Sequence, residues 1–372
     1  MNNRVSISAF CYTILACFAY PFHTTAQTGY KNSYSIGVHG FYGFVLKHAP
    51  SVGHLAKVHP YGFEINYNQI TTGNREWHKV YRYPEVGYAI GMFDFRNPVL
   101  GKAIYTFAYM DKALLQGASS SFRLKIGTGP VFITNPYDKE TNFQNTALSS
   151  RIMYGLRGEL IYSYGINKHW QIRSGIALTH FSNGAFKVPN SGINIPALKL
   201  GILYNPHVPV IHFAKADSTP DATYKRIEFN ISGAFTIKEI GLPGGKKYPG
   251  GVLSAYVNRR LNRKSGLNAG IDGFYNTAVK QMIQSDPDVD SLQVPDFKRV
   301  GITFGHELFI SRVSMLVQLG VYVYKPYQEA DTYLYQRYGL KYAINQYLFA
   351  GVSLKSHYGT ADYMEWTLGV RW

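Results

Sequence analysis

The stretch Met364-Glu365-Trp366-Thr367-Leu368-Gly369-Val370-Arg371-Trp372 alternates between two kinds of residue. Every even-numbered position is apolar, and the positions between them are charged, polar or glycine. Because successive side chains of a β-strand point to opposite faces, such a segment has one face suited to lipid and one suited to a polar interior. The alternation therefore predicts a membrane-spanning strand.

The same alternation recurs along most of the chain. Phe122 and Leu124, for example, share one face, while Arg123 and Lys125 share the other. The pattern predicts about sixteen strands, near residues 34–46, 58–69, 83–95, 102–113, 120–133, 149–164, 169–182, 192–204, 226–239, 250–261, 264–275, 298–310, 313–324, 331–343, 347–358 and 362–372. The last residue, Trp372, resembles the aromatic C-terminal signal of outer-membrane barrel proteins.

The predicted fold class is all-β, an antiparallel transmembrane β-barrel of the outer-membrane type. Tight turns such as 167–168 and 262–263 alternate with the longer connections 134–148, 183–191 and 276–297. Barrels of this type have short periplasmic turns and longer external loops. We expect one barrel of about sixteen strands, with the hairpin around 183–191 opening outward.

The connections 70–82 and 205–225 break this pattern, because both are long and yet fall on the side of the short turns. The connection 205–225 follows the eighth strand, and its prolines mark it as a linker. Residues 27–204 then form barrel strands that carry the candidate site, and residues 226–372 form further strands. Periodicity leaves open whether the halves share one barrel or form an eight-stranded barrel followed by a second eight-stranded unit.

Residues 1–26 predict a secretory signal peptide, with an apolar run from Ile7 to Tyr20 and a small-residue cleavage site after Ala26. Both cysteines, Cys11 and Cys17, lie inside this leader. The mature chain therefore has no thiol for a disulfide, a metal or catalysis. No later apolar run is long enough to predict a membrane-spanning helix.

Composition and charge indicate the same environment. Hydrophobic residues make up 46% of the chain, with 31 Tyr, 22 Phe and 36 Gly, which is typical of barrel strands with aromatic girdles. The net charge is +16. Because the leader exports the chain, we expect anionic lipid headgroups, including lipopolysaccharide phosphates, rather than nucleic acid as partners. The predicted location is the outer membrane of a Gram-negative bacterium.

One hairpin brings polar side chains to the lipid-facing side. In the strand near 169–182, the apolar face ends in His180 and Ser182. If Ser182 pairs with Gly192 across the hairpin, His180 pairs with Asn194, and directly opposed Cβ atoms lie about 4.5–5.5 Å apart. This spacing allows a hydrogen bond from the imidazole to the amide. Polar groups facing lipid are costly and are by default functional or at the interfacial rim.

These residue types suit ester hydrolysis. Ser182 would attack an ester carbonyl, His180 would take its proton and later deliver it to the leaving alcohol, and Asn194 would hold the imidazole tautomer. The backbone N–H groups of Asn183 and Gly184 are the nearest candidates for donors to the oxyanion. We expect no cofactor and no metal for this chemistry.

The segment His180-Phe181-Ser182-Asn183, followed by Pro189-Asn190, resembles the active-site segment of the lipid A 3-O-deacylase family, whose members are also described as acyloxyacyl hydrolases. The resemblance covers residues 28–204. It implies an eight-stranded outer-membrane barrel with a serine, histidine and glutamate triad exposed to the outer leaflet, and removal of an ester-linked acyl chain from lipid A. Where that family has glutamate, this chain has Asn194.

An asparagine at this spacing is similar instead to outer-membrane phospholipase A, whose triad is serine, histidine and asparagine. That enzyme uses calcium, held partly by an acidic residue in the intervening loop. Here the loop 184–191 contains Lys187 and no carboxylate. The loop therefore favours a metal-independent lipid A deacylase over a phospholipase, and Lys187 is a candidate contact for a lipid A phosphate.

A passive barrel, either a porin or a structural protein, is the alternative from a different class. In that case the interior charges would define a polar lumen: Arg157, Glu159, Arg173 and Lys199. A sixteen-stranded barrel is wide enough for an aqueous channel, whereas side chains fill an eight-stranded one.

Two further polar groups are interpreted as structural. His357 precedes the last strand much as His180 precedes the eighth, but its parity puts it on the interior face with Lys355, and no serine follows two residues later. The loop 276–297 is rich in aspartate, yet its spacing matches no compact calcium loop. We expect a solvated external loop there.

Overall fold

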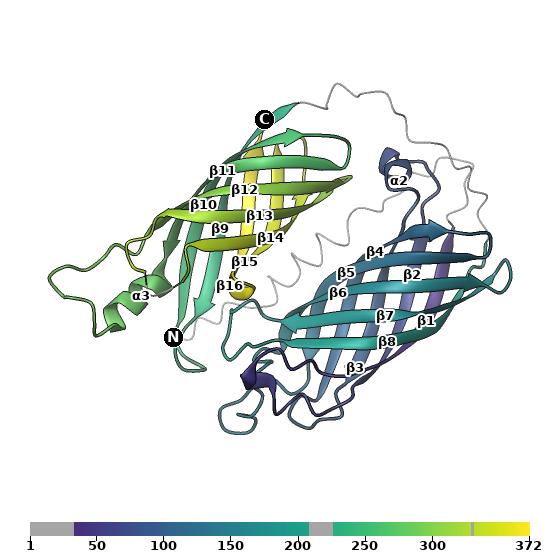
Figure 1. Ribbon diagram of the computed structural model, residues 1–372, viewed down its shortest axis with the longest axis horizontal. Coiled ribbons are helices and arrows are strands. Elements are labelled where there is room, and N and C mark those ends of the chain that lie inside the picture. The colour runs from purple at the N-terminus through teal and green to yellow at the C-terminus, as the bar shows by residue number, and fades with distance from the viewer. Residues whose placement is uncertain (1–32, 208–225, 329–330) are drawn as a thin grey trace, which may run out of the picture.

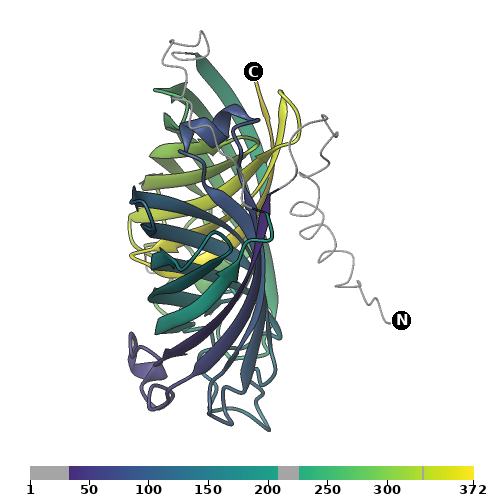
Figure 2. The ribbon, with the colours of Figure 1, turned by 90° about the vertical axis from the view of Figure 1, so that its right-hand side faces the viewer.

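The computed structural model describes residues 33–207, 226–328 and 331–372. The predicted signal peptide and most of the predicted linker lie outside the described residues. The described chain forms two closed antiparallel β-barrels, which lie side by side (Figure 1, Figure 2). The all-β fold class is confirmed, whereas the expected single barrel of about sixteen strands is wrong, and the two-barrel alternative fits.

Barrel 1 consists of the first eight strands. They are β1 (Tyr34–Gly43), β2 (Tyr61–Ile70), β3 (Glu85–Asp94), β4 (Lys102–Gln116), β5 (Ser120–Ile133), β6 (Ile152–Gly165), β7 (Trp170–Ser182) and β8 (Ile193–Tyr204). Each strand pairs with the next, and β8 closes the barrel on β1 with Ile202 opposite Val38. The strand that carries His180 is therefore the seventh of eight.

Barrel 2 repeats this arrangement. Its strands are β9 (Ile227–Glu239), β10 (Lys247–Arg260), β11 (Ser265–Asn276), β12 (Arg299–Ile310), β13 (Val313–Tyr324), β14 (Leu334–Ala343), β15 (Leu348–His357) and β16 (Thr360–Arg371). The alternating C-terminal stretch is β16, and it closes the barrel on β9 with Trp366 opposite Phe235.

The barrel interiors explain why each half can close on itself. Eight strands leave an interior that side chains can fill, and in barrel 1 buried ion pairs occupy it. Glu64 accepts hydrogen bonds from Arg157 at 2.5 Å and Lys125 at 3.2 Å, and Lys199 donates to Glu159 at 2.6 Å. In barrel 2, Arg337 likewise lies between Glu365 at 2.7 Å and Asp272 at 3.0 Å.

The two ends of each barrel differ in their connections. At the end we call the turn end, the tight turns begin with Asn167, Asn262 and Asn345. Each of these side chains accepts backbone N–H bonds from residues two or three positions on. Each of these turns is stabilised by hydrogen bonds to its own asparagine side chain. Because these contacts are local, the sequence alone predicts the turns. The opposite end, the loop end, carries most of the longer connections, including 183–192 after β7, whereas the long β2–β3 connection, 71–84, lies at the turn end.

The outward faces of the strands are apolar. Ile176, Leu178 and Leu198, for example, are 56%, 52% and 66% exposed, although large aliphatic side chains are usually buried in water-soluble proteins. Such a belt around a closed barrel suits the hydrocarbon core of a bilayer. Within the described residues, no helix has the length and apolar character needed to cross a membrane.

Short helices lie in three connections where only loops were expected. A 3-10 turn, η1 (Pro50–Val52), and the helix α3 (Thr277–Ser285) lie at the loop end. The helix α2 (Glu76–Val80) lies at the turn end. Asn276 caps α3 by accepting from Ala278 N, and the buried Val279 and Ile283 pack with Tyr327. The helix corrects the expectation of a solvated loop for residues 277–285, whereas the aspartate-rich residues 286–297 form a largely exposed loop as expected.

The two barrels touch at both ends. At the turn end, the Tyr81 hydroxyl, next to α2, donates to the backbone oxygen of Phe309 at 2.8 Å, and Glu76 forms an ion pair with Arg263. Burial raises the pKa of Tyr81 to about 12, so this hydroxyl stays protonated as a donor. At the loop end, Glu239 N donates to Ala185 O at 3.4 Å. The barrels therefore point the same way.

Candidate active site

The direction of the candidate side chains is set by the core of barrel 1. Phe181 is fully buried inside the barrel, where its ring lies near Phe93 and Tyr105. Because neighbouring strand residues face opposite ways, this anchor turns His180 and Ser182 to the outside. Both side chains lie partly exposed at the loop end of β7.

His180 and Asn194 are directly paired between β7 and β8. The predicted hydrogen bond is present: His180 Nδ1 lies 2.7 Å from Asn194 Oδ1. Because an amide oxygen can only accept, Nδ1 carries the proton and Nε2 is the ring nitrogen left to act as a base. The geometry matches what a base and its orienting residue require.

Gly192 leaves open the space that His180 and Ser182 share. A Cβ atom built on Gly192 would lie 2.9 Å from His180 Cε1 and 3.4 Å from Ser182 Cβ, so the two side chains flank the same point. Its φ of +70° also favours glycine. A side chain here would press on the imidazole and separate it from the hydroxyl.

The loop after β7 is held by buried polar contacts. Asn183 is buried, and its amide donates at 2.9 Å to Ser149 Oγ, Ser150 Oγ and the backbone oxygen of Lys187. Its backbone N–H donates to Asn190 Oδ1 at 3.1 Å. The N–H of Asn183 is therefore already bonded, which leaves Gly184 as the candidate oxyanion donor from the predicted pair.

The sequence alone does not indicate these supporting residues. Asn190 stands out only as part of the Pro189-Asn190 resemblance, and Ser149 and Ser150 come from the distant β5–β6 connection. A loop has no strand register, so nothing in the chain itself indicated which side chains would meet Asn183. A run of hydroxyl residues before a strand is the only available signal.

Barrel 2 forms one side of the site. A Cβ on Gly184 would lie 2.5 Å from Met364 Cγ and 3.5 Å from Leu354 Cδ1, so the site loop rests against the outward face of β15 and β16. The ammonium group of Lys247 lies 3.5 Å from the centre of the Phe186 ring. The predicted phosphate contact, Lys187, follows Phe186, and its positive charge repels that of Lys247.

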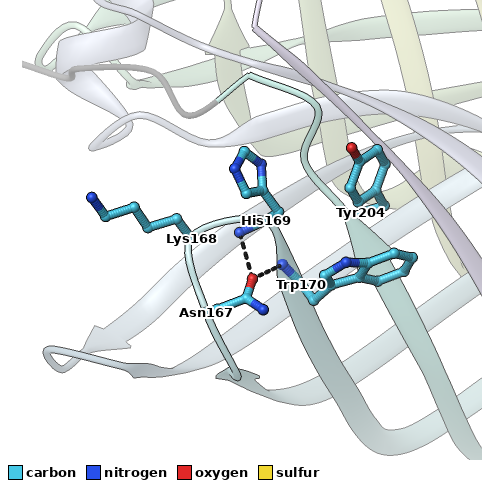
Figure 3. A pocket seen from close by; sticks show the side chains of 5 residues that line it. All are labelled: Asn167, Lys168, His169, Trp170 and Tyr204. Atoms are coloured by element: carbon cyan, nitrogen blue, oxygen red, sulfur yellow. Dashed lines mark hydrogen bonds between the residues drawn. The ribbon is translucent and has the colours of Figure 1, made fainter.

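A surface pocket elsewhere on β7 is separate from the candidate site. It encloses about 390 Å³ and is lined by Asn167, Lys168, His169, Trp170 and Tyr204 (Figure 3). Trp170 begins β7 and Ser182 ends it, so the pocket lies at the turn end. Trp170 and Tyr204 pack with ring centres 4.7 Å apart, as in an interfacial aromatic girdle.

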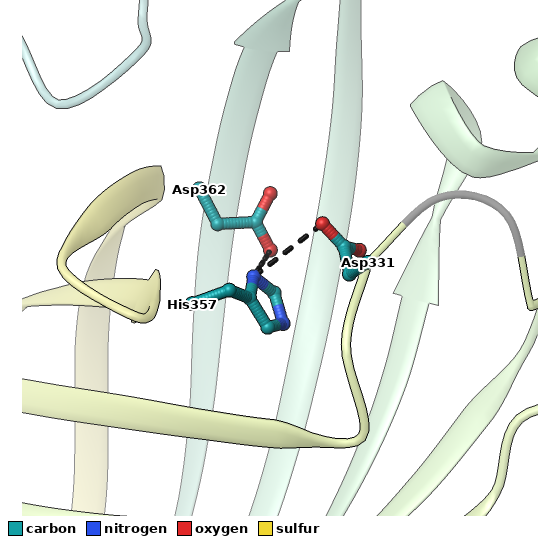
Figure 4. A group of neighbouring side chains, drawn as sticks. All are labelled: Asp331, His357 and Asp362. Atoms are coloured by element: carbon teal, nitrogen blue, oxygen red, sulfur yellow. Dashed lines mark ion pairs between the residues drawn. The ribbon is translucent and has the colours of Figure 1, made fainter. Parts of the chain in front are cut away.

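In barrel 2, His357 ends the seventh strand, as His180 nearly does in barrel 1. It lies inside the barrel near Asp331 at 3.4 Å and Asp362 at 3.7 Å (Figure 4). Although these three could surround a metal ion, both carboxylates already pair with cations: Arg299, Lys355 and Lys238. The cluster suits an internal ion network better than a divalent cation.

The connection after this strand also differs from its counterpart. His357 pairs with Thr360 across the two-residue turn formed by Tyr358 and Gly359, both with positive φ. Such a turn joins two strands in the tightest way. Barrel 2 therefore lacks the long loop that follows β7, and the outward polar pair has no equivalent here.

The fold and the site together define a lipid-facing β-barrel with a serine, a histidine and an amide at one rim. Residues 61–202 match the family model described as "Lipid A 3-O-deacylase (PagL)", and residues 226–372 match "Acyloxyacyl hydrolase, C-terminal domain". The two matches together span most of both barrels, and the chain belongs to this family of lipid A deacylases. The second match also accounts for the half of the chain that the resemblance had left unexplained.

Solved structures resemble the chain only distantly. The crystal structure of Neisserial surface protein A is 9% identical, with a TM-score of 0.34, and covers 46% of this chain and 96% of that one. The KdgM porin is 7% identical, with a TM-score of 0.18, and covers 91% of this chain and 98% of that one. A comparison with curated protein sequences gave no match.

Proposed function

We propose that the protein is a serine esterase of the Gram-negative outer membrane that removes an ester-linked acyl chain from lipid A of lipopolysaccharide. The observation that carries the proposal is the 2.7 Å contact between His180 Nδ1 and Asn194 Oδ1 on the lipid-facing rim, beside Ser182. Polar side chains at such a surface are costly unless they have a function. Family membership supports lipid A as the substrate.

The reaction follows from this arrangement. Ser182 Oγ attacks the ester carbonyl carbon while His180 Nε2 takes its proton, and a tetrahedral oxyanion forms. The oxyanion accepts a hydrogen bond from the N–H of Gly184. As the intermediate collapses, the proton passes to the departing alcohol, and the acyl group stays on Ser182. Water, activated by His180, then releases the fatty acid and restores the serine.

Asn194 orients the imidazole without a negative charge. A neutral amide fixes the tautomer, but it stabilises the transient imidazolium less than a carboxylate does. We therefore expect slower turnover than a glutamate would give. Lys187, at the same rim, is the proposed contact for a lipid A phosphate.

Mass spectrometry of lipids tests the proposal. Lipid A and phospholipids are incubated with the full-length wild-type protein and with Ser182→Ala, with calcium and with chelator. The expected result is lipid A short of one acyl chain, produced only by the wild type and in both calcium conditions. Calcium-dependent fatty-acid release from phospholipid alone would make the protein a phospholipase, and unchanged lipids throughout would refute the esterase.

A further inference from the structure

The lipid-facing wall of barrel 2 carries a groove that the site does not explain. It has a volume of about 630 Å³ and crosses β16, β9, β10, β11 and β12. Three outward glycines from neighbouring strands line it: Gly233, Gly251 and Gly273. The groove forms where these glycines leave the outer face of the barrel wall without side chains.

Neither packing nor backbone conformation requires glycine at these positions. A Cβ on Gly233 would meet nothing within 4 Å, and the nearest atoms to a Cβ on Gly251 and Gly273 are 3.7 and 4.0 Å away. None of the three has a positive φ. Glycine inside a strand weakens it and often marks a place where a ligand approaches closely.

Over Gly251, two aromatic rings form the walls of the groove, and we call this part the slot. Phe235 and Tyr275 pair with Gly251 from either side and are 50% and 51% exposed. The strands that carry these two residues lie two strand spacings, about 10 Å, apart. This distance admits one hydrocarbon chain between the rings. Trp366 stacks on Phe235, and Phe297 packs edge-on against Tyr275, so both walls are held in place.

A positive charge lies above this slot on the same strand. The outward positions of β10 run from Lys247 at the loop end to Gly251, a distance of about 14 Å along the strand. Lys247 contacts Phe186 of the site loop. Its cross-strand partner Glu239 accepts hydrogen bonds from the N–H groups of Gly244 and Gly245 with one carboxylate oxygen, and its negative charge also acts on Lys247. Lys247 therefore lies between the candidate active site and the groove.

We propose that the slot over Gly251 binds an acyl chain of the lipid A substrate while Lys247 binds one of its phosphates, so that barrel 2 supplies part of the substrate site. The proposal rests on the proposed function for the identity of the lipid. An apolar slot below a cationic rim matches the chemistry of a phosphorylated lipid, whose charged headgroup lies at the membrane surface. The second barrel then contributes to binding rather than to catalysis.

Lipid A binding to the full-length Ser182→Ala protein tests the slot, because this background leaves the lipid intact. Gly251→Leu fills the slot, and Gly40→Leu is the matched control, an outward glycine of barrel 1 with only Leu200 O at 3.9 Å. By native mass spectrometry we expect Gly251→Leu to weaken lipid A binding about tenfold and the control to leave it unchanged. Equal binding by the two folded variants would overturn the slot.

The charge is tested with two lipids. Lys247→Gln should weaken binding of lipid A but not of the same lipid with its phosphates removed, whereas Lys139→Gln, at an exposed loop-end lysine, should change neither. An equal loss with both lipids would show that Lys247 is not the phosphate contact.

The two proposals can fail separately. If the wild type hydrolyses lipid A while Gly251→Leu binds lipid A normally, only the proposal of the slot is wrong. If the variants change lipid A binding as expected but the wild type hydrolyses no lipid, only the proposal of an esterase is wrong.

Discussion

Asn194 is the residue at which this chain departs from the glutamate expected by resemblance. Its carbonyl oxygen accepts the bond from His180 Nδ1 at 2.7 Å, so removing the amide frees the ring to rotate. We expect Asn194→Ala to lower kcat about a hundredfold with little change in KM, because positioned acid–base catalysis contributes on that scale. Hydrolysis of a soluble short-chain ester measures the effect without involving lipid binding.

Asn194→Asp is the informative partner of that variant. The aspartate keeps the acceptor and adds the charge that stabilises imidazolium, so we expect its kcat to equal or exceed that of the wild type. Wild-type kcat in Asn194→Ala would show that this residue does not orient the base. The bond itself was predictable, because β7 and β8 are antiparallel neighbours joined by one hairpin, and the hairpin register fixes which residues face each other. The Asn183 and Asn190 contact was not, because loop residues follow no such rule.

Glu64 holds together several strands of barrel 1 from its interior. It is fully buried and accepts from Arg157 at 2.5 Å, Lys125 at 3.2 Å and Tyr105 at 3.1 Å. Glu64→Ala would leave these donors, two of them cationic, with unmet bonds in a buried space. We expect a loss of about 3–5 kcal/mol in the free energy of unfolding, as for other broken buried ion pairs.

Denaturant titration of the protein in lipid vesicles, followed by tryptophan fluorescence, measures this loss. Glu140→Ala is the control, since its side chain is 78% exposed and lies 3.9 Å from Lys139. Its free energy of unfolding should stay within about 0.5 kcal/mol of the wild type. An equally small effect for Glu64→Ala would mean that water, not the carboxylate, satisfies the interior cations.

Strands were the most predictable elements of this fold. Alternation located all sixteen strands, and the asparagine turns were visible because their chemistry is local. The helices α2 and α3 were missed, since each is short and is stabilised by contacts with distant residues such as Phe309 and Tyr327. Local patterns show an element only when local forces produce it.

Closure is a property of the whole molecule, and periodicity could not determine it. An alternating strand has the same pattern whether β8 pairs with β1 or with β9. Pairing with β1 makes two narrow barrels, whose interiors are filled by ion pairs, instead of one wide lumen. We therefore expect no steady conductance when the protein is inserted into planar bilayers. Open channels that persist in Ser182→Ala would instead favour the passive barrel.

Docking of the two barrels is the remaining feature of the whole molecule, and the predicted loss of both leader cysteines makes it testable. Glu76→Cys and Arg263→Cys replace an ion pair that joins the barrels at the turn end. A short bismaleimide should link these cysteines within one molecule. It should not link Glu76→Cys to Lys298→Cys, because Lys298 precedes β12 at the loop end of barrel 2. Links formed only between molecules would show that the barrels do not dock as described.

The cross-linked protein then shows whether catalysis needs the barrels to move. The site loop rests on Met364 and Leu354 at the end opposite the link, so a link that preserves native docking leaves these contacts unchanged. We expect lipid A hydrolysis at the wild-type rate. A cross-linked protein that still hydrolyses a soluble ester but not lipid A would mean that the barrels must separate for the lipid to enter between them.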